Sequence, residues 1–519
     1  MTKLGVDFGT TRTLVAGVDR GNYPVVTFLD PVGEAHEHFP SVVAELDGQL
    51  LYGLAALDAA THKGAVLLRS FKRLLAAPDV SGSQKIEFVD VDVTLFELLT
   101  GYLTALRVAL IERSNLVRKK NDLVFDAVIA VPAHAHGAQR FLTLEAFRAA
   151  GFSVRAMINE PSAAGFEYSH RQARTVNTRR TRVVVYDLGG GTFDASLVKV
   201  DGTRHEVTGT AGLNRVGGDD FDMVLFRLAL TAAGVDDASL SARERATTLM
   251  SCREAKERLT AQSKRVFVDV KGAEIAVAVD EYFAAVTPLV EATVTAMRPL
   301  LGSLEPALGG TPAPGEDKSP DVGADIAGIY LVGGGSGLPL VPRLLKERFG
   351  RRVHRSPHPA ASTAIGLAIA ADEDAGFSLA DRLSRGFGVF RDKNAGQGVA
   401  FDPIFLPDVA LPEVGRADGG VVISRRYRAA HNLGCFRFVE CSSVDDVGDP
   451  RGDLLPFAEV LFPFDPALQR KKKLDDVVIE RLGSGPRIEE RYTIDPHGLV
   501  EVQIIDVDTG YQQTHRIGR

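Results

Sequence analysis

The chain has 519 residues, of which 45% are hydrophobic and 24% charged, and its net charge is −7. This length exceeds what one hydrophobic core usually holds, so we expect two to four domains. The acidic balance argues against a nucleic-acid binder, and the three cysteines (Cys252, Cys435 and Cys441) include no C-x-x-C pair and predict no disulfide framework.

The same features predict a cytoplasmic protein. Met1 leads directly into a strand-like apolar run, which leaves no room for a signal peptide. The longest apolar stretch, residues 364–371, is far too short to span a bilayer. Cysteines without a disulfide pattern fit a reducing compartment. We therefore expect neither a membrane nor a nucleic acid among the partners.

The first predicted element is a β-hairpin over residues 4–15, which read LGVDFGTTRTLV. An apolar run ends in Asp7, a Gly/Thr turn follows, and a second apolar run returns. Residues 124–131 (VFDAVIAV) then predict a buried strand, and residues 139–150 predict a helix that stops at Gly151. Strands that alternate with helices in this way indicate an α/β architecture.

A second predicted hairpin repeats the first. Residues 184–198 read VVYDLGGGTFDASLV, with Asp187 and Asp194 on either side of a glycine turn. Residues 326–332 predict another strand, and a helix is predicted from Pro339 to the residue before Gly350. The repeat suggests two related half-domains that face one anion, which we interpret as the phosphate tail of a nucleotide.

The composition changes in two stretches. Residues 309–323 are rich in proline and glycine and predict an exposed insertion, and residues 371–384 predict a linker. Beyond it the helical period disappears, and residues 488–494 and 500–504 alternate with a period of two. The turn residues Asp495-Pro496-His497-Gly498 join these runs as a hairpin. A separate antiparallel β domain is therefore expected from about residue 385 onward.

A phosphate tail with Mg²⁺ needs close approach of the backbone, N–H donors and carboxylates. Asp7 and Asp187 end their strands where such a metal would lie, and Asp194 closes the second hairpin. The turns supply hydroxyl groups from Thr10, Thr11 and Thr192. One glycine-rich turn alone is usually an ordinary hairpin tip, but two turns that each follow an Asp favour a phosphate site. No G-x-x-x-x-G-K-[ST] loop is present, and no G-x-G-x-x-G lies at a strand–helix turn, which argues against P-loop and dinucleotide sites.

These motifs resemble those of the 70-kilodalton heat-shock chaperones, which belong to the actin-like ATPase superfamily. The nucleotide-site signatures are matched by Asp7–Thr11 (DFGTT), Asp187–Asp194 (DLGGGTFD) and Leu331–Ser336 (LVGGGS). Further family segments are matched by Phe71–Leu74 (FKRL), Asn159–Ala164 (NEPSAA) and Gly217–Asp222 (GGDDFD). The resemblance covers residues 1–372 and continues more weakly through the β tail.

The resemblance implies an α/β fold with a duplicated, actin-like (ribonuclease H-like) ATPase domain of two lobes over residues 1–372. It implies an interdomain linker over residues 373–384 and a β-sandwich like the family's substrate-binding domain over residues 385–519, with no room for a helical lid. The implied cofactors are ATP and Mg²⁺. Unfolded or extended polypeptides are the implied clients, with J-domain and nucleotide-exchange cochaperones as further partners.

The resemblance also implies roles for single residues. The carboxylates that would hold the waters of Mg²⁺ and position the attacking water are Asp7, Asp187, Asp194 and Glu160. Lys72 would neutralise charge on the β- and γ-phosphates, and Thr192 would approach the γ-phosphate. The remaining nucleotide contacts would come from Gly9, Thr10, Thr11, Arg12, Gly189, Gly190, Gly191, Gly217, Gly218, Lys256, Gly333, Gly334, Gly335 and Ser336. Pro132 and Arg140 match positions that relay the nucleotide state toward the linker.

Four positions and one segment depart from the family pattern, and two of these positions, Glu257 and Arg258, differ from the commoner residues of the helix that contacts adenosine. Gly337 stands where the family usually has an arginine that stacks on adenine, and Ala360 replaces an aspartate near the nucleoside, so we expect weaker selection of the base and weaker ATP binding. Charges interrupt the linker run Phe377–Leu383 (FSLADRL), so the sequence leaves open whether the domains communicate. His134 and His136 lack an evident third metal ligand and are expected to be solvated loop histidines.

The sequence therefore predicts an ATP-driven, chaperone-like protein whose β domain binds extended peptides. One alternative is a nucleotide-dependent scaffold or sensor whose β tail docks a single partner. A filament-forming actin-like ATPase is disfavoured by the β tail and by Asn159–Ala164. A small-molecule kinase is disfavoured by Lys72 and by the lack of an acceptor-pocket motif.

Overall fold

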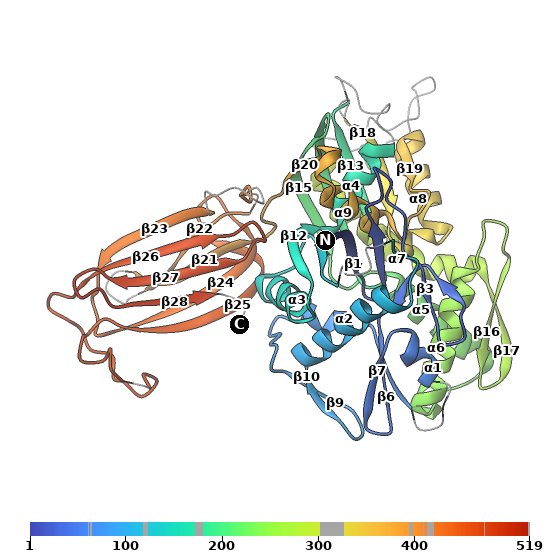
Figure 1. Ribbon diagram of the computed structural model, residues 1–519, viewed down its shortest axis with the longest axis horizontal. Helices are drawn as coiled ribbons and strands as arrows, with labels where there is room; N and C mark the ends of the chain where they lie inside the picture. Colours follow the sequence, from blue (N-terminus) through green and yellow to red (C-terminus); the bar gives the residue numbers. More distant parts are fainter. Residues whose placement is uncertain are drawn as a thin grey trace.

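The computed structural model describes residues 1–60, 62, 65–117, 123–171, 180–301, 326–393, 398–407, 409–412, 420–471 and 473–516. The insertion predicted over residues 309–323 lies outside these ranges. Figure 1 shows a mixed α/β part, which contains most of the chain, and a body of antiparallel strands attached to one side of it. We call this second body, strands β21 to β28, the β domain.

Two mixed sheets organise the α/β part. The first sheet has the strand order β12 (Ser153–Asn159), β11 (Phe125–Val131), β1 (Thr2–Phe8), β2 (Arg12–Gly17) and β5 (Phe39–Pro40). The second sheet has the order β19 (Val353–Arg355), β18 (Ile326–Val332), β13 (Arg182–Leu188), β14 (Phe193–Asp201), β15 (Arg204–Leu213) and β20 (Ser378–Ala380). In each sheet the first strand of a hairpin, β1–β2 or β13–β14, pairs with a parallel strand, which in turn pairs with one more. The chain thus uses one pattern of strand connections twice.

Helices connect and cover these sheets (Figure 1). The α-helices are α1 (Leu54–Ala59), α2 (Leu95–Glu112), α3 (Gly137–Ala149), α4 (Glu160–Arg171), α5 (Gly218–Ala233), α6 (Ala242–Glu257), α7 (Val279–Met297), α8 (Leu340–Phe349) and α9 (Ser362–Ala371). The 3-10 helices are η1 (Phe71–Ala76), η2 (Asp237–Ser239), η3 (Arg298–Leu301), η4 (Gly334–Gly337), η5 (Gly350–Arg352) and η6 (Glu373–Ala375). None of the helices in the described ranges combines the length and the apolar character that a membrane crossing requires.

Small residues allow α9 to lie close to its neighbours. Its sequence, STAIGLAIAA, has short side chains at most positions, and nearly all of them are buried. A Cβ atom on Gly366 would lie 1.8 Å from the carbonyl oxygen of Ala163 in α4, and one on Gly5 would lie 2.3 Å from that of Ala364. The backbones of α9, α4 and β1 are therefore in direct contact, and larger residues at these positions would separate them.

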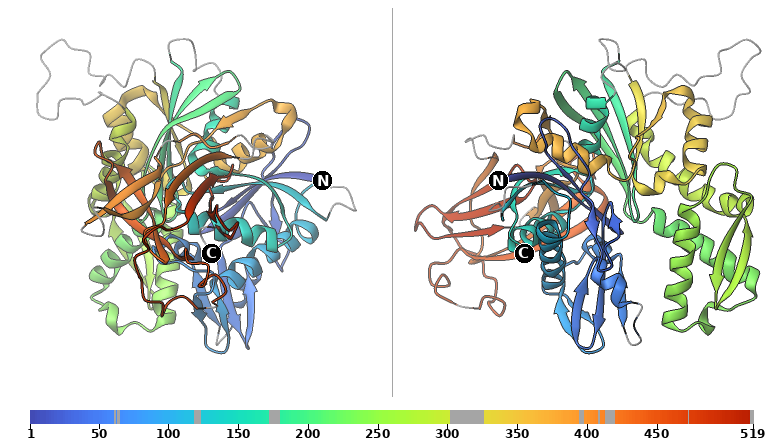
Figure 2. Two further views of the ribbon diagram at one scale, coloured as in Figure 1. Left: turned by 90° about the vertical axis from the view of Figure 1, so that its left-hand side faces the viewer. Right: turned by 45° about the vertical axis from the view of Figure 1, so that its right-hand side comes forward.

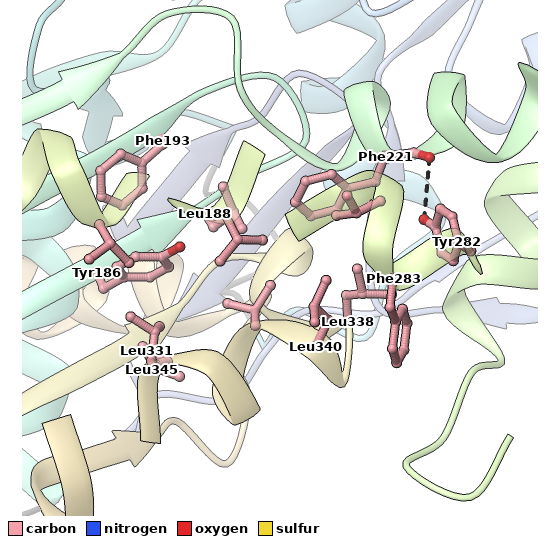
Figure 3. Packing of buried hydrophobic residues seen from close by; sticks show 14 of the residues in the cluster. Tyr186, Leu188, Phe193, Phe221, Tyr282, Phe283, Leu331, Leu338, Leu340 and Leu345 are labelled. Carbon is pink, nitrogen blue, oxygen red and sulfur yellow. Dashed lines mark hydrogen bonds between the residues drawn. The ribbon is translucent and has the colours of Figure 1, made fainter. Parts of the chain in front are cut away.

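The largest core lies against the second sheet. Figure 3 shows Tyr186, Leu188, Phe193 and Leu331 of this sheet packed with side chains from α5, α7 and α8. The hydroxyl of Tyr282 donates to the carbonyl oxygen of Phe221 at 3.2 Å, so the polar end of this buried ring is satisfied. The core holds the glycine turns that follow β13 and β18 in fixed positions.

Smaller sheets extend the α/β part. They are the pairs β3 (Phe28–Leu29) with β4 (Ala35–His36), β9 (Lys85–Glu87) with β10 (Asp92–Thr94) and β16 (Arg265–Val270) with β17 (Ala273–Ala278), and the sheet β7 (Gln49–Tyr52), β6 (Val42–Leu46), β8 (Val66–Arg69). In Figure 2 the blue segments that carry β6 and the light-green segments that carry β16 extend as two arms from the central sheets.

The β domain consists of two four-stranded antiparallel sheets. One has the order β22 (Gly398–Phe405), β21 (Gly386–Lys393), β24 (Leu433–Val444) and β25 (Pro450–Pro463). The other has the order β23 (Val421–Arg428), β26 (Arg487–Ile494), β27 (Val500–Asp506) and β28 (Gln512–Arg516). The predicted period of two is confirmed, since Val500, Val502 and Ile504 are buried and the residues between them are not. Glu490 shares the buried register of β26 with Tyr492, which the hydrophobic pattern alone does not explain.

The other predicted strands and helices of the α/β part are confirmed, with ends that differ by at most three residues. The strand expected over residues 124–131 is β11, and the helix expected over residues 139–150 is α3, which begins at Gly137. His136 caps α3 by accepting the N–H of Gln139 at 3.3 Å and is only 6% exposed. The expectation of a solvated loop histidine is therefore wrong for His136, because the helix start and the β domain cover this loop.

The β domain contacts the α/β part at α3 and along the linker. The carboxylate of Glu440 in β24 accepts the N–H of Gly137 at the start of α3, at 3.0 and 3.1 Å. Arg140 donates to the carbonyl oxygen of His497, in the turn between β26 and β27, at 3.2 Å. Strand β20, within the predicted linker, pairs in parallel with β15. These contacts join the two bodies through polar groups as well as through the linker.

Candidate active site

A cavity of about 370 Å³ lies where the two hairpins meet. The sequence-predicted residues that line it are Asp7, Gly9, Thr10, Thr11, Arg12, Lys72, Glu160, Asp187, Gly189, Gly190, Thr192, Gly218, Lys256, Gly333, Gly334 and Gly335. Four other predicted residues are not part of its lining: Asp194, Gly191, Gly217 and Ser336. The fold therefore collects most of the predicted residues from both sheets at one place.

The two hairpin tips are built alike. The N–H of Gly9 donates to the carbonyl oxygen of Arg12, and the N–H of Gly189 donates to that of Thr192, both at 3.0 Å. In the strand register Asp7 faces Leu14, and Asp187 faces Asp194. Each tip therefore presents its aspartate at the end of the first strand, while only the second hairpin has an acid on its returning strand.

The hairpin tips touch because glycine leaves room for the other tip. A Cβ atom on Gly190 would lie 2.7 Å from the methyl group of Thr11. A Cβ on Gly333, whose φ is +81°, would lie 2.3 Å from Oδ1 of Asp187. Any side chain at Gly333 would thus displace this aspartate and would also strain the backbone.

Lys72 and Glu160 form a buried ion pair beside the aspartates. Their Nζ and Oε1 atoms are 3.0 Å apart, and Lys72 is only 4% exposed. The ammonium group also lies 5.4 Å from the centre of the Phe8 ring. A lysine is rarely buried without a partner, so this pair fixes a positive charge at the wall of the cavity.

The aspartates carry more negative charge than one lysine can offset. Burial and the charge of Glu160 raise the pKa of Asp7 to about 7, against a lowering effect of Lys72. Burial and Glu160 raise the pKa of Asp194 to about 7 as well, and the pKa of Asp187 is raised for the same reasons. Buried carboxylates that resist ionisation favour a bound cation, which would stabilise their charged forms.

Asp194 lies behind the cavity wall. Its carboxylate accepts the N–H of Ala133 at 3.0 Å, in the segment that follows β11, and it is buried. The second hairpin is thereby tied to the loop that leads into α3. Ser336 is also turned away from the cavity and donates to the carbonyl oxygen of Gly333 at 2.7 Å, which fixes the turn after β18. The side chains of Asp194 and Ser336 thus have backbone partners outside the cavity lining.

Several residues close the cavity from both sides and were not among the predicted site residues. Arg73, next to Lys72, bonds to Asp220 at 3.0 Å and to the carbonyl oxygen of Gly191 at 3.2 Å. Ser70, whose φ of +52° is unusual for a residue with a side chain, donates to Asp219 at 2.8 Å. The motifs Phe71–Leu74 and Gly217–Asp222 contain or adjoin these residues, but their pairing needs the folded chain.

Further residues, which were not among those predicted to bind the nucleotide, line the remainder of the cavity. They are Leu14, Asp219, Arg253, Glu257, Gly337, Leu338, Arg355, Pro359, Ala360 and Thr363. Glu257 forms an ion pair with Arg12 across the mouth, and Arg253 pairs with Asp219 at 2.7 Å. Gly337 and Ala360, where the sequence departs from the family pattern, therefore both belong to the site. No sequence signal marks Arg355, because its place depends on the pairing of β19 with β18.

A polar chain leads from the cavity to the linker. Asn159 precedes Glu160, and its side chain donates to Asp381 of the linker at 2.9 Å. Arg140 donates to the side-chain oxygen of Asn159 at 2.5 Å. It also donates to the carbonyl oxygen of His497 in the β domain. Burial raises the pKa of Asp381, while Arg140 lowers it. The charged residue that interrupts the apolar linker thus has a defined partner next to the site.

Comparisons with known proteins agree with these features. The sequence model of the Hsp70 protein family matches residues 3–383. A chaperone protein HscA homolog of Paracidovorax citrulli is 31% identical over 388 residues, and one of Burkholderia pseudomallei is 33% identical over the same length. Each match covers 72% of this chain and 58% of the relative, so the chain matches a little more than half of the relatives' length. The match spans the whole cavity and both sheets around it, and the chain therefore belongs to the Hsp70 family.

Proposed function

We propose that this chain is an ATPase that hydrolyses ATP, with Mg²⁺, in the cavity between the hairpin tips. The observation that carries the proposal is that Asp7 and Asp187, from two similar hairpins, line one cavity together with the Lys72–Glu160 pair. We further propose that residues 1–372 form a duplicated actin-like domain of the ribonuclease H-like type, with one lobe around each sheet. Its support is the pattern of strand connections that the two sheets share.

The donor set fits a hydrated Mg²⁺ ion. Asp7 and Asp187 offer carboxylate oxygens at the cavity, and Asp194 lies directly behind them. The raised pKa values of these three aspartates indicate that the nearby positive charge is too small to offset their negative charge. Mg²⁺ prefers oxygen ligands and keeps several waters, which suits carboxylates that would act through water. When bound, the ion would supply charge neutralisation for the phosphate tail.

The roles of the other residues follow from their positions. The N–H groups of the two turns would bind phosphate oxygens, because glycine allows a close approach there. Lys72 is held by Glu160 and would stabilise the charge that develops on the transferred phosphoryl group. Thr192 would approach the γ-phosphate from the second hairpin. Glu160 would orient the attacking water through Oε2, since its Oε1 is the oxygen that contacts Lys72.

The test is a change of Lys72 to Ala, measured on the full chain. We expect ATP to bind with nearly the affinity of the unaltered chain in calorimetric titration, and single-turnover hydrolysis to fall by about a hundredfold or more, because the loss is mainly of transition-state stabilisation. The matched control is Lys85→Ala, since Lys85 lies exposed in β9. Unchanged hydrolysis in Lys72→Ala would remove this lysine from the mechanism.

We also propose that the β domain, over residues 385–519, binds unfolded or extended polypeptide segments, and that the state of the nucleotide changes their affinity. Support comes from the sheets themselves, whose edge strands, β22, β25, β23 and β28, offer unpaired backbone groups to an extended chain. The relatives are named chaperone proteins, which is consistent with this proposal. J-domain and nucleotide-exchange cochaperones would be the further partners.

Residues 373–384 would act as the linker that joins the two activities. The polar chain from Glu160 through Asn159 to Asp381 supports this role, because it connects the cavity to the linker by direct contacts. A panel of unfolded model peptides tests the proposal on the full chain: several should bind, and ATP should change their dissociation rates. A chain that binds none of them would instead fit a dedicated docking module.

The free thiols of Cys252, Cys435 and Cys441 fit a cytoplasmic protein, which we propose as its location.

A further inference from the structure

The basic residues that line the cavity differ in whether a carboxylate pairs with them. Most of them are paired with a carboxylate, and these are Arg12, Lys72, Arg253 and Lys256. Arg355 lines the same cavity, is exposed, and forms no ion pair or side-chain hydrogen bond with any described residue. Because its guanidinium group has no competing partner among the residues that the structure describes, it can contact a ligand in the cavity.

The position of Arg355 is fixed by the second sheet. It is the last residue of β19 and stands in register with Leu331 of β18. The turn that follows β18 leads to Gly337, at the end of η4. Nη2 of Arg355 lies 3.5 Å from the point where a Cβ atom on Gly337 would be. The guanidinium group therefore fills the space that a side chain on residue 337 would enter.

The surroundings of Arg355 favour contact with a base over contact with phosphate. Asp187 and the second hairpin lie against Gly333, at the start of the turn after β18. Gly337 lies four residues further along the chain, and the uncharged Leu338, next to it in sequence, and Ala360 also line the cavity. A planar guanidinium group stacks well on an aromatic ring system and is only weakly hydrated, so a nucleobase suits it there.

We infer that Arg355 is the cation that stacks on the nucleobase at this site, in place of the arginine that the family usually has at the position of Gly337. The inference rests on the proposed function, since it assigns the base-contacting residue of the same nucleotide site. Arg355 reaches this place from the neighbouring strand β19 and not from the turn after β18. The contact that the sequence analysis expected to be missing would thereby be supplied by a residue about twenty positions further along the chain.

The test compares two ligands that differ in the base. The full chain and its Arg355→Ala variant are titrated calorimetrically with ATP and with inorganic tripolyphosphate, both with Mg²⁺. We expect the affinity for ATP to fall roughly three- to tenfold in the variant, and the affinity for tripolyphosphate to stay unchanged. Arg351→Ala is the matched control, because Arg351 is exposed in η5 nearby and does not line the cavity.

Each outcome has a distinct meaning. An equal loss for both ligands would place Arg355 on the phosphates and would overturn the inference, as would an unchanged affinity for ATP. If the unaltered chain binds tripolyphosphate and ATP equally well, the base makes no contact and the inference is wrong, while the phosphate site stands. If the unaltered chain binds neither ligand, the proposed function itself fails.

A second variant tests whether the two positions are equivalent. Gly337 does not have a positive φ, and a Cβ atom there would make only an ordinary contact, so the backbone accepts a side chain. In Gly337→Arg combined with Arg355→Ala, we expect at least half of the lost affinity for ATP to return. Gly337→Arg alone should give no such gain, because it brings a second cation against Arg355. A double variant as weak as Arg355→Ala would overturn the equivalence.

Discussion

The ion pair between Arg391 and Glu490 is expected to stabilise the β domain. Both nitrogens Nη1 and Nη2 of Arg391 bond to the carboxylate of Glu490, at 3.0 and 2.7 Å, and join the two sheets of the domain. Glu490 has no exposed side-chain surface and also accepts the hydroxyl groups of Tyr427 and Tyr492. Arg391 bonds in addition to Asp402 at 2.7 Å. Glu490 is thus a buried charge whose compensation depends on Arg391.

The change Arg391→Met keeps an unbranched side chain of about the length of the arginine's aliphatic stem and removes the charged guanidinium group. It leaves Glu490 buried with two hydroxyl donors and no cation, which typically costs about 3–5 kcal/mol. Asp402 remains paired with Arg425 at 3.0 Å, so only one carboxylate loses its partner. We expect the free energy of unfolding of the β domain to fall by about 3 kcal/mol, because the two tyrosine hydroxyls still donate to the buried charge of Glu490.

Hydrogen exchange of the full chain measures this loss of stability at the amides of the β domain itself. A loss of about 3 kcal/mol makes the exchange of protected amides in β26 about a hundredfold faster, when exchange occurs through unfolding of the domain. Arg437→Met is the matched control, since Arg437 pairs with Glu459 at 3.2 Å on strands of the same domain, with 70% and 57% of these side chains exposed. Such an exposed surface pair contributes little to stability, because solvent screens it.

Two results would refute the reasoning. In the first, Arg391→Met changes the exchange of β26 no more than Arg437→Met does. In the second, Arg391→Met combined with Glu490→Gln is no more stable than Arg391→Met alone. The double change removes the uncompensated charge and should restore at least part of the loss, because the cost arises from the orphaned carboxylate and not from the missing arginine.

Three further predictions concern the α/β part and its contact with the β domain. The pKa of Asp194 is raised to about 7 in the folded chain, so between pH 4 and 7 the folded state binds a proton that the unfolded state has lost. The folded state therefore becomes less stable as the pH rises through this range. Asp194→Asn should raise the melting temperature of the metal- and nucleotide-free chain at pH 8 more than at pH 5. Asp381→Ala removes the acceptor of Asn159, so we expect near-normal basal hydrolysis and a loss of its stimulation by model peptide, measured in single-turnover assays. Glu440→Lys places a cation against the start of α3 and close to Arg385, and should expose residues 137–141 to faster hydrogen exchange, whereas unchanged protection would argue against this contact.

Local sequence pattern predicts the parts of the fold that depend on local physics. The hairpins β1–β2 and β13–β14 follow from apolar runs around glycine turns, and β26–β27 follows from a period of two and a turn of known chemistry. Helix α3 begins two residues earlier than predicted, because His136 accepts a backbone N–H that the apolar pattern does not reveal. The elements themselves are thus predictable, and their ends depend on single capping contacts.

The candidate site is only partly predictable for the same reason. Residues within the repeated motifs, such as Asp7 and Asp187, could be named because the motif itself describes their surroundings. Arg355 could not, because it reaches the cavity through the pairing of β19 with β18. Glu490 reads in the sequence as an acid within an apolar period, and only the facing strand supplies the arginine that accounts for it.

The linker shows how a charge that breaks a pattern can have a structural reason. An apolar run interrupted by Asp381 and Arg382 suggests weaker docking when the linker is considered alone. In the folded chain Asp381 accepts from Asn159, and Arg382 pairs with Glu206 at 2.7 Å, so neither charge is left in an apolar contact. Asn159 is bonded to its neighbour Glu160, which holds Lys72 in the cavity. Under the proposed function, a ligand that moves Glu160 would act on the linker through two covalently adjacent residues and one hydrogen bond, so the linker charges are compatible with the proposed coupling.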